Sequence, residues 1–290
     1  MADGNRVSLS ANIGAAWTRL TRGLPRSGRP RRHGWTIAVV LGAAALVGLA
    51  MLFLDERSIA WAKGLAPGDA FFFQSITGFG RSAWPLVPSG VVLALLAVGD
   101  WTRVPRRIAA AWAEFGALLG AFFLAVAGAG LLTDVIKWSI GRSRPVLFWT
   151  DGTLTFTPAS FDYAHVSFPS GHATTVAAVA LFAWLVLRVW SLPVVAVCIA
   201  IAVSRVAVGA HYPSDVVAGV IVGLLFTGLL IAALARRRIA FSVGPGGIRP
   251  RATALRPLLL SRAGRRRLVG GLALAFRLTE PRRTTLRGRR

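Results

Sequence analysis

Six long apolar stretches constrain the fold of this chain more than any other feature. They cover residues 37–54, 84–98, 108–138, 173–190, 192–210 and 216–235. The first holds no charged residue and is longer than the usual apolar region of a cleavable signal peptide, so it is expected to remain as a membrane helix. Hydrophobic residues make up 54% of the chain and the mean hydropathy is +0.60, whereas in soluble domains the share seldom exceeds about half. The sequence therefore predicts an all-α, polytopic membrane protein, a bundle of six transmembrane helices.

The basic residues are distributed unevenly between the two sides of such a bundle. With a cytoplasmic N-terminus, 27 of the 34 Lys and Arg residues fall on the inner side and 7 on the outer side. The excess of positive charge on cytoplasmic segments favours this orientation. We therefore expect a multi-pass protein of the plasma (bacterial inner) membrane with both termini in the cytoplasm. The expected parts are a basic arm (1–35), a membrane domain (36–238) and an Arg-rich tail (239–290).

The tail has a marked charge bias. Residues 236–290 contain 16 Arg and a single acidic residue, Glu280. Anionic lipids of the inner leaflet attract such segments by about 1 kcal/mol per basic residue near the surface. Residues 255–278 mix Arg with Leu, Val and Phe, as an interfacial helix does. We expect the membrane surface, rather than nucleic acid, to be the partner of this tail; the oligomeric state stays open.

A short polar segment, from Ser204 to Asp215, interrupts the apolar pattern. Ionisable groups at membrane depth are costly and point to function. Asp215 follows His211 by four residues, so its carboxylate can reach the imidazole and leave the other ring nitrogen free as a nucleophile or base. Arg205 offers a fork of donors suited to phosphate oxygens. Taken alone, the segment also fits a loop His beside a helix-capping Asp.

Two further polar segments are predicted to lie at the same membrane level. Lys137 and Arg144 flank the outer end of the third stretch, and Ser170, Gly171 and His172 open the fourth. Ser170 suits an N-cap, Gly171 allows close approach to the backbone, and the free N–H groups of a helix start attract anions. Each residue has a purely structural alternative, such as an interfacial anchor or a cap. Their convergence at one depth favours an anion-binding site on the outer face.

Two other polar residues are expected to have lesser roles. Arg142 lies between Lys137 and Arg144 but outside the anion-binding set, so its replacement should be mild. Glu114, near the start of the third stretch, is expected to serve helix packing or the membrane interface rather than catalysis.

The three segments together resemble the three signature motifs of the type-2 phosphatidic acid phosphatase superfamily. The motifs are Lys137 to Arg144-Pro145, Pro169-Ser170-Gly171-His172, and Ser204-Arg205 to His211 and Asp215. They occur in the family's order and spacing, and the resemblance covers about residues 110–235. The family includes membrane lipid phosphatases and shares its site with soluble vanadium haloperoxidases.

The resemblance implies a two-step phosphoryl transfer. It assigns His211 as the nucleophile, Asp215 as the group that fixes its tautomer, and His172 as the acid for the leaving oxygen and later the base for water. The residues that would stabilise the phosphoryl oxygens are Lys137, Arg144, Ser170, Gly171 and Arg205. These cations would supply the charge, so no cofactor and no metal ion is expected.

Three classes of function are compatible with these residues. A membrane lipid phosphatase fits best, acting on an isoprenyl pyrophosphate, phosphatidylglycerol phosphate or phosphatidic acid, because a site at the bilayer surface can take the headgroup while the tails stay in lipid. A vanadium-haloperoxidase-like enzyme would use the same pocket, but the known ones are soluble. A non-catalytic anion-binding membrane protein, such as a transporter, would not need the pairing of His211 with Asp215.

Overall fold

The structure is a computed structural model that describes residues 12, 14, 18 and 33–276. The basic arm expected at 1–35 therefore lies almost entirely outside the described residues. The last part of the Arg-rich tail, 277–290, also lies outside them.

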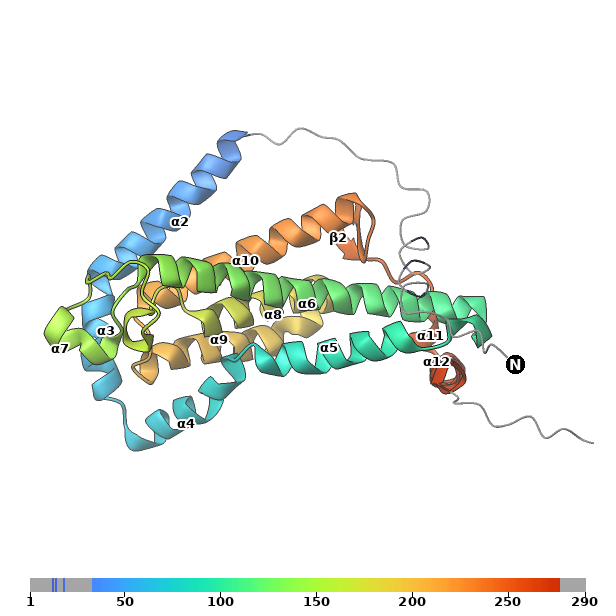
Figure 1. The fold of residues 1–290 in the computed structure, drawn as a ribbon, viewed down its shortest axis with the longest axis horizontal. Coiled ribbons are helices and arrows are strands. Elements are labelled where there is room, and N and C mark those ends of the chain that lie inside the picture. Colours follow the sequence, from blue (N-terminus) through green and yellow to red (C-terminus); the bar gives the residue numbers. More distant parts are fainter. Residues whose placement is uncertain (1–11, 13, 15–17, 19–32, 277–290) are drawn as a thin grey trace, which may run out of the picture.

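Long helices running side by side form the body of the molecule (Figure 1). α5, α6, α8, α9 and α10 share the long axis of the molecule, and α2 leans away from them. The bounds of the helices in the body are α2 His33–Phe53, α3 Asp55–Lys63, α4 Pro67–Thr77, α5 Ala83–Val98, α6 Arg106–Ile140, α8 Gly171–Leu187, α9 Leu192–Ala207 and α10 Pro213–Arg236. Each of the six predicted apolar stretches coincides with one of these helices.

The number of membrane spans depends on how joined helices are counted. By length and composition, four helical runs of the described residues could cross a bilayer: 67–98, 106–140, 171–207 and 213–236. A fifth arises if α2 and α3, which meet at a bend of 52°, form one broken span. The run 171–207 contains both α8 and α9, which pack side by side through residues such as Val179 and Cys198. The chain is thus a helical, multi-pass membrane protein, and the count of six stays a prediction.

Small residues allow α10 to lie against α8. A Cβ added at Gly219 would lie 2.3 Å from the backbone oxygen of Ser170, and one at Gly223 would lie 2.5 Å from that of Thr174. Glycine at these two positions lets the backbones approach closely, as small residues do between membrane helices. This contact brings the beginning of α10 next to the beginning of α8.

The segment between α6 and α8 is held by hydrogen bonds rather than being loose. α6 ends at Gly141, whose φ of +67° favours glycine and where a Cβ would collide with the Thr157 carbonyl. Ser143 N then donates to Thr155 O at 3.0 Å, and Ser167 N to the carbonyl of Arg142 at 2.9 Å. The short elements of this segment are η3 Pro145–Leu147, α7 Phe148–Asp151 and η4 Tyr163–His165.

The first part of the tail packs on the bundle. An antiparallel hairpin, β1 Phe241–Gly244 and β2 Gly247–Pro250, follows α10; the sequence analysis did not predict it. Phe241 is fully buried, with its ring centroid 5.7 Å from that of Phe182.

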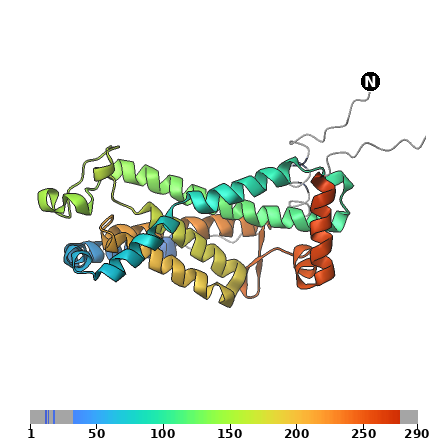
Figure 2. The same ribbon diagram turned by 90° about the horizontal axis from the view of Figure 1, so that it is seen from below.

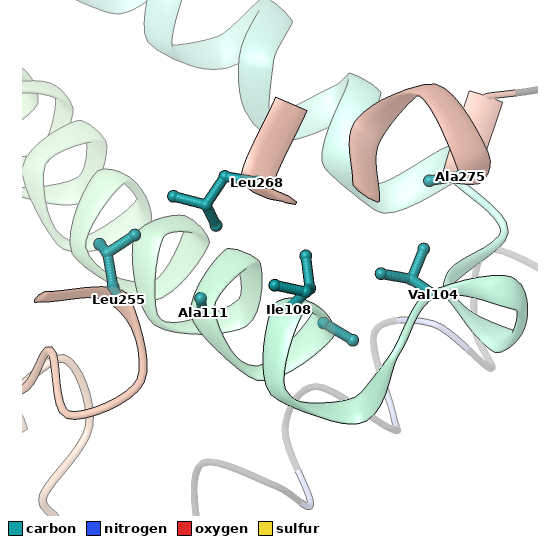
Figure 3. Packing of buried hydrophobic residues seen from close by; sticks show 7 residues of the cluster. Val104, Ile108, Ala111, Leu255, Leu268 and Ala275 are labelled. Atoms are coloured by element: carbon teal, nitrogen blue, oxygen red, sulfur yellow. The ribbon is translucent and has the colours of Figure 1, made fainter. Parts of the chain in front are cut away.

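Two short helices, α11 Leu255–Leu260 and α12 Arg262–Phe276, then pack against the start of α6. Figure 3 shows Leu255 and Leu268 pointing toward Ala111 and Ile108, with Ala275 near Val104. The contact buries apolar surface at the end of the bundle opposite α7 (Figure 1).

Glu114 joins α6 to this tail. Its carboxylate accepts hydrogen bonds from Thr253 Oγ1 at 2.7 Å, Ala254 N at 2.8 Å and Leu255 N at 2.9 Å. It thereby satisfies free N–H groups at the start of α11. The packing role predicted for Glu114 is confirmed.

Candidate active site

The predicted site residues lie at the ends of α6 and α9, at the beginnings of α8 and α10, and in the loops between these helices, all at one end of the bundle. Lys137 lies in the last turn of α6, and Ser170 caps α8. Arg205 lies in the last turn of α9, and Asp215 in the first turn of α10. This is the end of the bundle near α3 and α7, far from α11 and α12 (Figures 1 and 2).

The His211 ring faces two oxygen groups through Nδ1. Asp215 Oδ2 lies 3.7 Å from Nδ1, which is longer than an ordinary hydrogen bond, and Ser167 Oγ lies 3.4 Å from the same nitrogen. Ser167 in turn donates to Asp215 Oδ2 at 2.6 Å. The hydroxyl of Ser167, which the sequence analysis missed, therefore links the imidazole to the carboxylate. With Nδ1 occupied in this way, Nε2 is the ring nitrogen free for chemistry.

His211 is almost completely buried, with 2% of its surface exposed. Burial lowers the pKa of the imidazole from 6.5 to about 4, although the neighbouring Asp215 acts in the opposite direction. The ring is consequently neutral at pH 7, the form that a nucleophile needs.

This pKa makes a prediction for the pH dependence of activity. A lowered pKa keeps His211 unprotonated down to about pH 4. Because a protonated imidazole cannot act as a nucleophile, kcat/KM should fall on this account only below that pH. The measurement is kcat/KM between pH 3 and 8, corrected for ionisation of the substrate, with circular dichroism confirming the folded state. A fall in kcat/KM with a midpoint near pH 6.5, the ordinary pKa of histidine, would contradict the prediction if it arises from His211.

Arg144 is held by the loop and by the residue before His211. Its guanidinium donates to the carbonyls of Tyr163 at 2.7 Å, Ala210 at 3.0 Å and Val166 at 3.3 Å, and it lies 4.0 Å from the centroid of the Tyr163 ring. A guanidinium has five N–H donors, so donors remain for a ligand.

Arg205 has a buried donor for which the described residues provide no acceptor. Its NH1 group donates to Thr77 Oγ1 at 2.5 Å, but Nε has no hydrogen-bond partner among the described residues. Because buried donors are nearly always paired, an unpaired guanidinium N–H in a site of this kind calls for an anion. The carbonyl of Arg205 also accepts from His211 N at 3.1 Å, which ties the two residues together.

The start of α8 brings the remaining predicted residues to the same place. Ser170 Oγ accepts from Ala173 N at 3.4 Å, so the predicted N-cap is confirmed. Lys137 Nζ would lie 3.6 Å from a Cβ added at Gly171. Arg205, His211 and Lys137 interact electrostatically with the His172 imidazole. Arg144 and Lys137 interact in the same way with the His211 imidazole. The structure therefore gathers all eight predicted residues.

Gly80 also contacts this group, although the sequence analysis did not single it out. A Cβ there would lie 2.5 Å from Cδ2 of His172, so only glycine leaves room for the imidazole ring.

Arg142 is placed differently from the prediction. The sequence analysis treated it as peripheral, but it is fully buried and forms ion pairs with Asp55 at 2.7 Å and Asp215 at 2.6 Å. The expectation that its replacement should be mild is therefore withdrawn. Asp55 was also missed; the only sequence signal was an acid directly after an apolar stretch.

Within the part of the chain that the structure describes, no three His, Cys, Asp or Glu side chains are grouped so that they could hold a metal ion. The positive charges that act on His172 or His211 include those of Lys137, Arg144, Arg205 and Arg81.

The chain is similar to several known phosphatases. The family model of the PAP2 superfamily matches residues 118–239. A lipid A 1-phosphatase of Rhizobium johnstonii is 37% identical over 239 residues, covering 82% of this chain and 93% of that protein. A lipid A 1-phosphatase of Rhizobium etli is 40% identical over 203 residues, covering 69% of this chain and 86% of that protein. A crystal structure of a transmembrane PAP2-type phosphatidylglycerolphosphate phosphatase from Bacillus subtilis aligns with a TM-score of 0.46 and 25% identity, over 68% of this chain and 94% of that one.

The apolar helices, the cationic site and these likenesses define a membrane-embedded lipid phosphatase, a hydrolase of phosphoric monoesters. The chain belongs to the PAP2 superfamily.

Proposed function

We propose that the chain removes the terminal phosphate of a lipid phosphate at the outer face of the membrane, through a phosphohistidine formed on His211. The observation that carries this proposal is the buried Nε of Arg205, which has no acceptor among the described residues, on a residue whose carbonyl accepts from the backbone N–H of the neutral, buried His211. Phosphoryl transfer requires donors that stabilise the phosphoryl oxygens and a nucleophile that attacks phosphorus, and these two residues would supply them.

In the first step, Nε2 of His211 attacks phosphorus and forms an N–P bond. The bond from phosphorus to the lipid oxygen breaks, and His172 gives that oxygen a proton. Asp215 and Ser167 hold the Nδ1 side of the ring and stabilise the positive charge that it gains. In the second step, His172 takes a proton from water, the water oxygen attacks phosphorus, and the N–P bond breaks to release inorganic phosphate.

The phosphoryl oxygens would be held by Lys137, Arg144, Arg205, Ser170 and the N–H of Gly171. Fixed donors and cations in a site closed to water stabilise the charge of a transferring phosphoryl group strongly. We therefore propose a reaction that needs no metal ion.

For the substrate, the similarity to two lipid A 1-phosphatases favours the 1-phosphate of lipid A or a related glycolipid phosphate. Isoprenyl pyrophosphates, phosphatidylglycerol phosphate and phosphatidic acid present the same terminal phosphoryl group and are the competing candidates.

A substrate panel tests the proposal. The purified protein in detergent is given each of these lipids, with and without EDTA, and inorganic phosphate is measured. Release from lipid A that exceeds release from the others and survives EDTA is expected. No release from any lipid would refute the proposed function. Loss of release with EDTA, restored by Mg²⁺, would refute only the metal-free mechanism.

The tail would contact the anionic inner leaflet. α12 lies across the long axis of the bundle (Figures 1 and 2), as a helix in the plane of the membrane does. Its exposed residues combine Arg262, Arg265 and Arg266 with apolar Val269 and Phe276. This composition supports a place at the boundary between headgroups and acyl chains.

The proposed orientation predicts a labelling pattern. With buried Cys198 replaced by Ala, a cysteine at exposed Leu154 should react with a membrane-impermeant maleimide in intact cells. A cysteine at exposed Pro245, in the hairpin turn, should react only after permeabilisation. The reverse pattern would place the site on the cytoplasmic side and overturn the choice of outer-leaflet substrates.

A further inference from the structure

A buried ionic network lies behind the nucleophile, outside the phosphate-binding group. Arg142 donates through NH1 to Asp215 Oδ1 at 2.6 Å and through NH2 to Asp55 Oδ2 at 2.7 Å. Ser214 completes the network: its hydroxyl donates to Asp55 Oδ2 at 2.6 Å, and its backbone N–H donates to Asp55 Oδ1 at 3.0 Å. The four residues link the junction of α2 and α3, the loop after α6 and the start of α10.

Because this network is buried, each of its charged groups must be paired and hydrogen-bonded within the protein. The side chains of Asp55, Arg142 and Asp215 are each 0% exposed. A buried charge is tolerated only when it is paired and hydrogen-bonded, and removing one partner leaves the others uncompensated. Such networks add little to the net free energy of folding. Their main effect is to hold the groups that they join in one arrangement.

The guanidinium of Arg142 has little freedom to move. Nε and NH2 donate to the carbonyl of Thr153 at 3.1 and 2.6 Å. Its Cζ lies 4.5 Å from the centroid of the Tyr212 ring and 6.0 Å from that of Phe156. The hydrogen bonds to Thr153 and the contacts with the two aromatic rings thus restrict the orientation of the Arg142 guanidinium.

The two oxygens of Asp215 have separate tasks. Oδ1 faces Arg142, whereas Oδ2 accepts from Ser167 Oγ at 2.6 Å and Tyr212 N at 2.9 Å and lies nearest His211. Holding Oδ1 fixes the plane of the carboxylate, and this directs Oδ2 at Ser167 and the imidazole.

Asp55 has a further effect because it shares the guanidinium. Arg142 uses one nitrogen for each carboxylate, so neither pair is the two-pronged pairing that Arg and a carboxylate prefer. Without the charge on Asp55, Arg142 would be free to pair with both oxygens of Asp215 and draw Oδ2 away from Ser167.

We propose that Asp55 and Arg142 are positioning residues for the nucleophile, and that Asp55 keeps Arg142 on a single oxygen of Asp215. Asp55 lies outside residues 118–239, the region that matches the family model, and it belongs to none of the three motifs. The inference rests on the proposed function, because it assigns a purpose to the orientation of His211.

Asp55→Asn is the primary test, with Glu56→Gln as its matched control. Asn keeps the shape of Asp55 but not its charge, whereas Glu56 is the next residue on the same helix and is exposed. We expect kcat on the best lipid substrate to fall by about 10²-fold, as small misplacements of reacting groups do. Inhibition by inorganic phosphate should stay near wild type, since Lys137, Arg144 and Arg205 are untouched. The thermal midpoint in detergent should fall by only a few degrees, because Arg142 keeps the charge of Asp215 as its partner. Glu56→Gln should match wild type in all three measurements.

Arg142→Lys and the double variant supply the second test. Lys keeps the positive charge but lacks the planar, five-donor guanidinium that holds Asp55, Asp215 and the Thr153 carbonyl in one fixed geometry, so its kcat should fall as that of Asp55→Asn does. Because both changes break one network, the double variant should be no slower than the slower single variant.

Wild-type kcat in Asp55→Asn would overturn the proposal. So would a joint loss of kcat, phosphate inhibition and thermal stability, which marks a merely structural role. Multiplying losses in the double variant would do the same. The proposed function has a separate point of failure, namely wild-type protein that releases no phosphate from any lipid.

Discussion

Replacing His211 with Ala is expected to abolish phosphate release from every substrate, whereas His172→Ala should keep part of its activity on a substrate with a good leaving group. His211 would form the covalent bond to phosphorus, and no leaving group can compensate for its loss. In the proposed mechanism His172 would act mainly by giving a proton to the leaving oxygen, a contribution of about 10²–10⁴-fold in general acid catalysis. The p-nitrophenolate of p-nitrophenyl phosphate departs without that proton.

The measurement is kcat for both variants on a lipid phosphate and on p-nitrophenyl phosphate, if the wild type accepts the latter. His172→Ala should fall steeply on the lipid and much less on the nitrophenyl ester. Quenching the wild type during turnover in SDS at alkaline pH, where the acid-labile N–P bond of a phosphohistidine survives, should trap label from a ³²P-phosphorylated substrate on the protein, and His211→Ala should trap none. Equal losses for both variants on both substrates would contradict the assigned roles.

Arg205→Ala should lower kcat by about 10²–10³-fold, the usual cost of removing one electrostatic stabiliser of a transition state. Its Nε is the buried donor without an acceptor among the described residues, so the loss falls on the bound phosphoryl group rather than on the fold. Arg144→Ala should lower kcat by a similar factor and also reduce thermal stability, because Arg144 donates to three backbone carbonyls.

The matched control is Arg57→Ala, which removes an exposed Arg from α3 at the same end of the molecule. Arg142 cannot serve as this control, because it is buried between Asp55 and Asp215. A loss in Arg57→Ala as large as that in Arg205→Ala would mean that bulk positive charge, and not aimed contacts, attracts the substrate.

Much of the site was predictable because its residues occur in three short segments. The distance along the chain from His211 to Asp215 and the helix start at Ser170 are local features, and the apolar stretches put the ends of several helices at one level. The structure confirms that these segments meet, and it adds Ser167 between the imidazole and the carboxylate.

The residues behind the site were not predictable in the same way. Asp55 and Arg142 are 87 positions apart, and Arg142 and Asp215 are 73 apart. No local periodicity relates such distant residues, and as isolated charges near membrane helices they look like interfacial groups.

The sequence by itself determined the class of this protein: the apolar stretches required membrane helices, and the three motifs predicted a phosphate site at their ends. Only the tertiary structure decided which charges are buried together, that Arg142 bridges Asp55 and Asp215, and that α11 and α12 pack on the start of α6. The physical reason is that hydrophobicity sets which segments leave water, whereas side-chain packing and complementary charge set which faces of those segments meet.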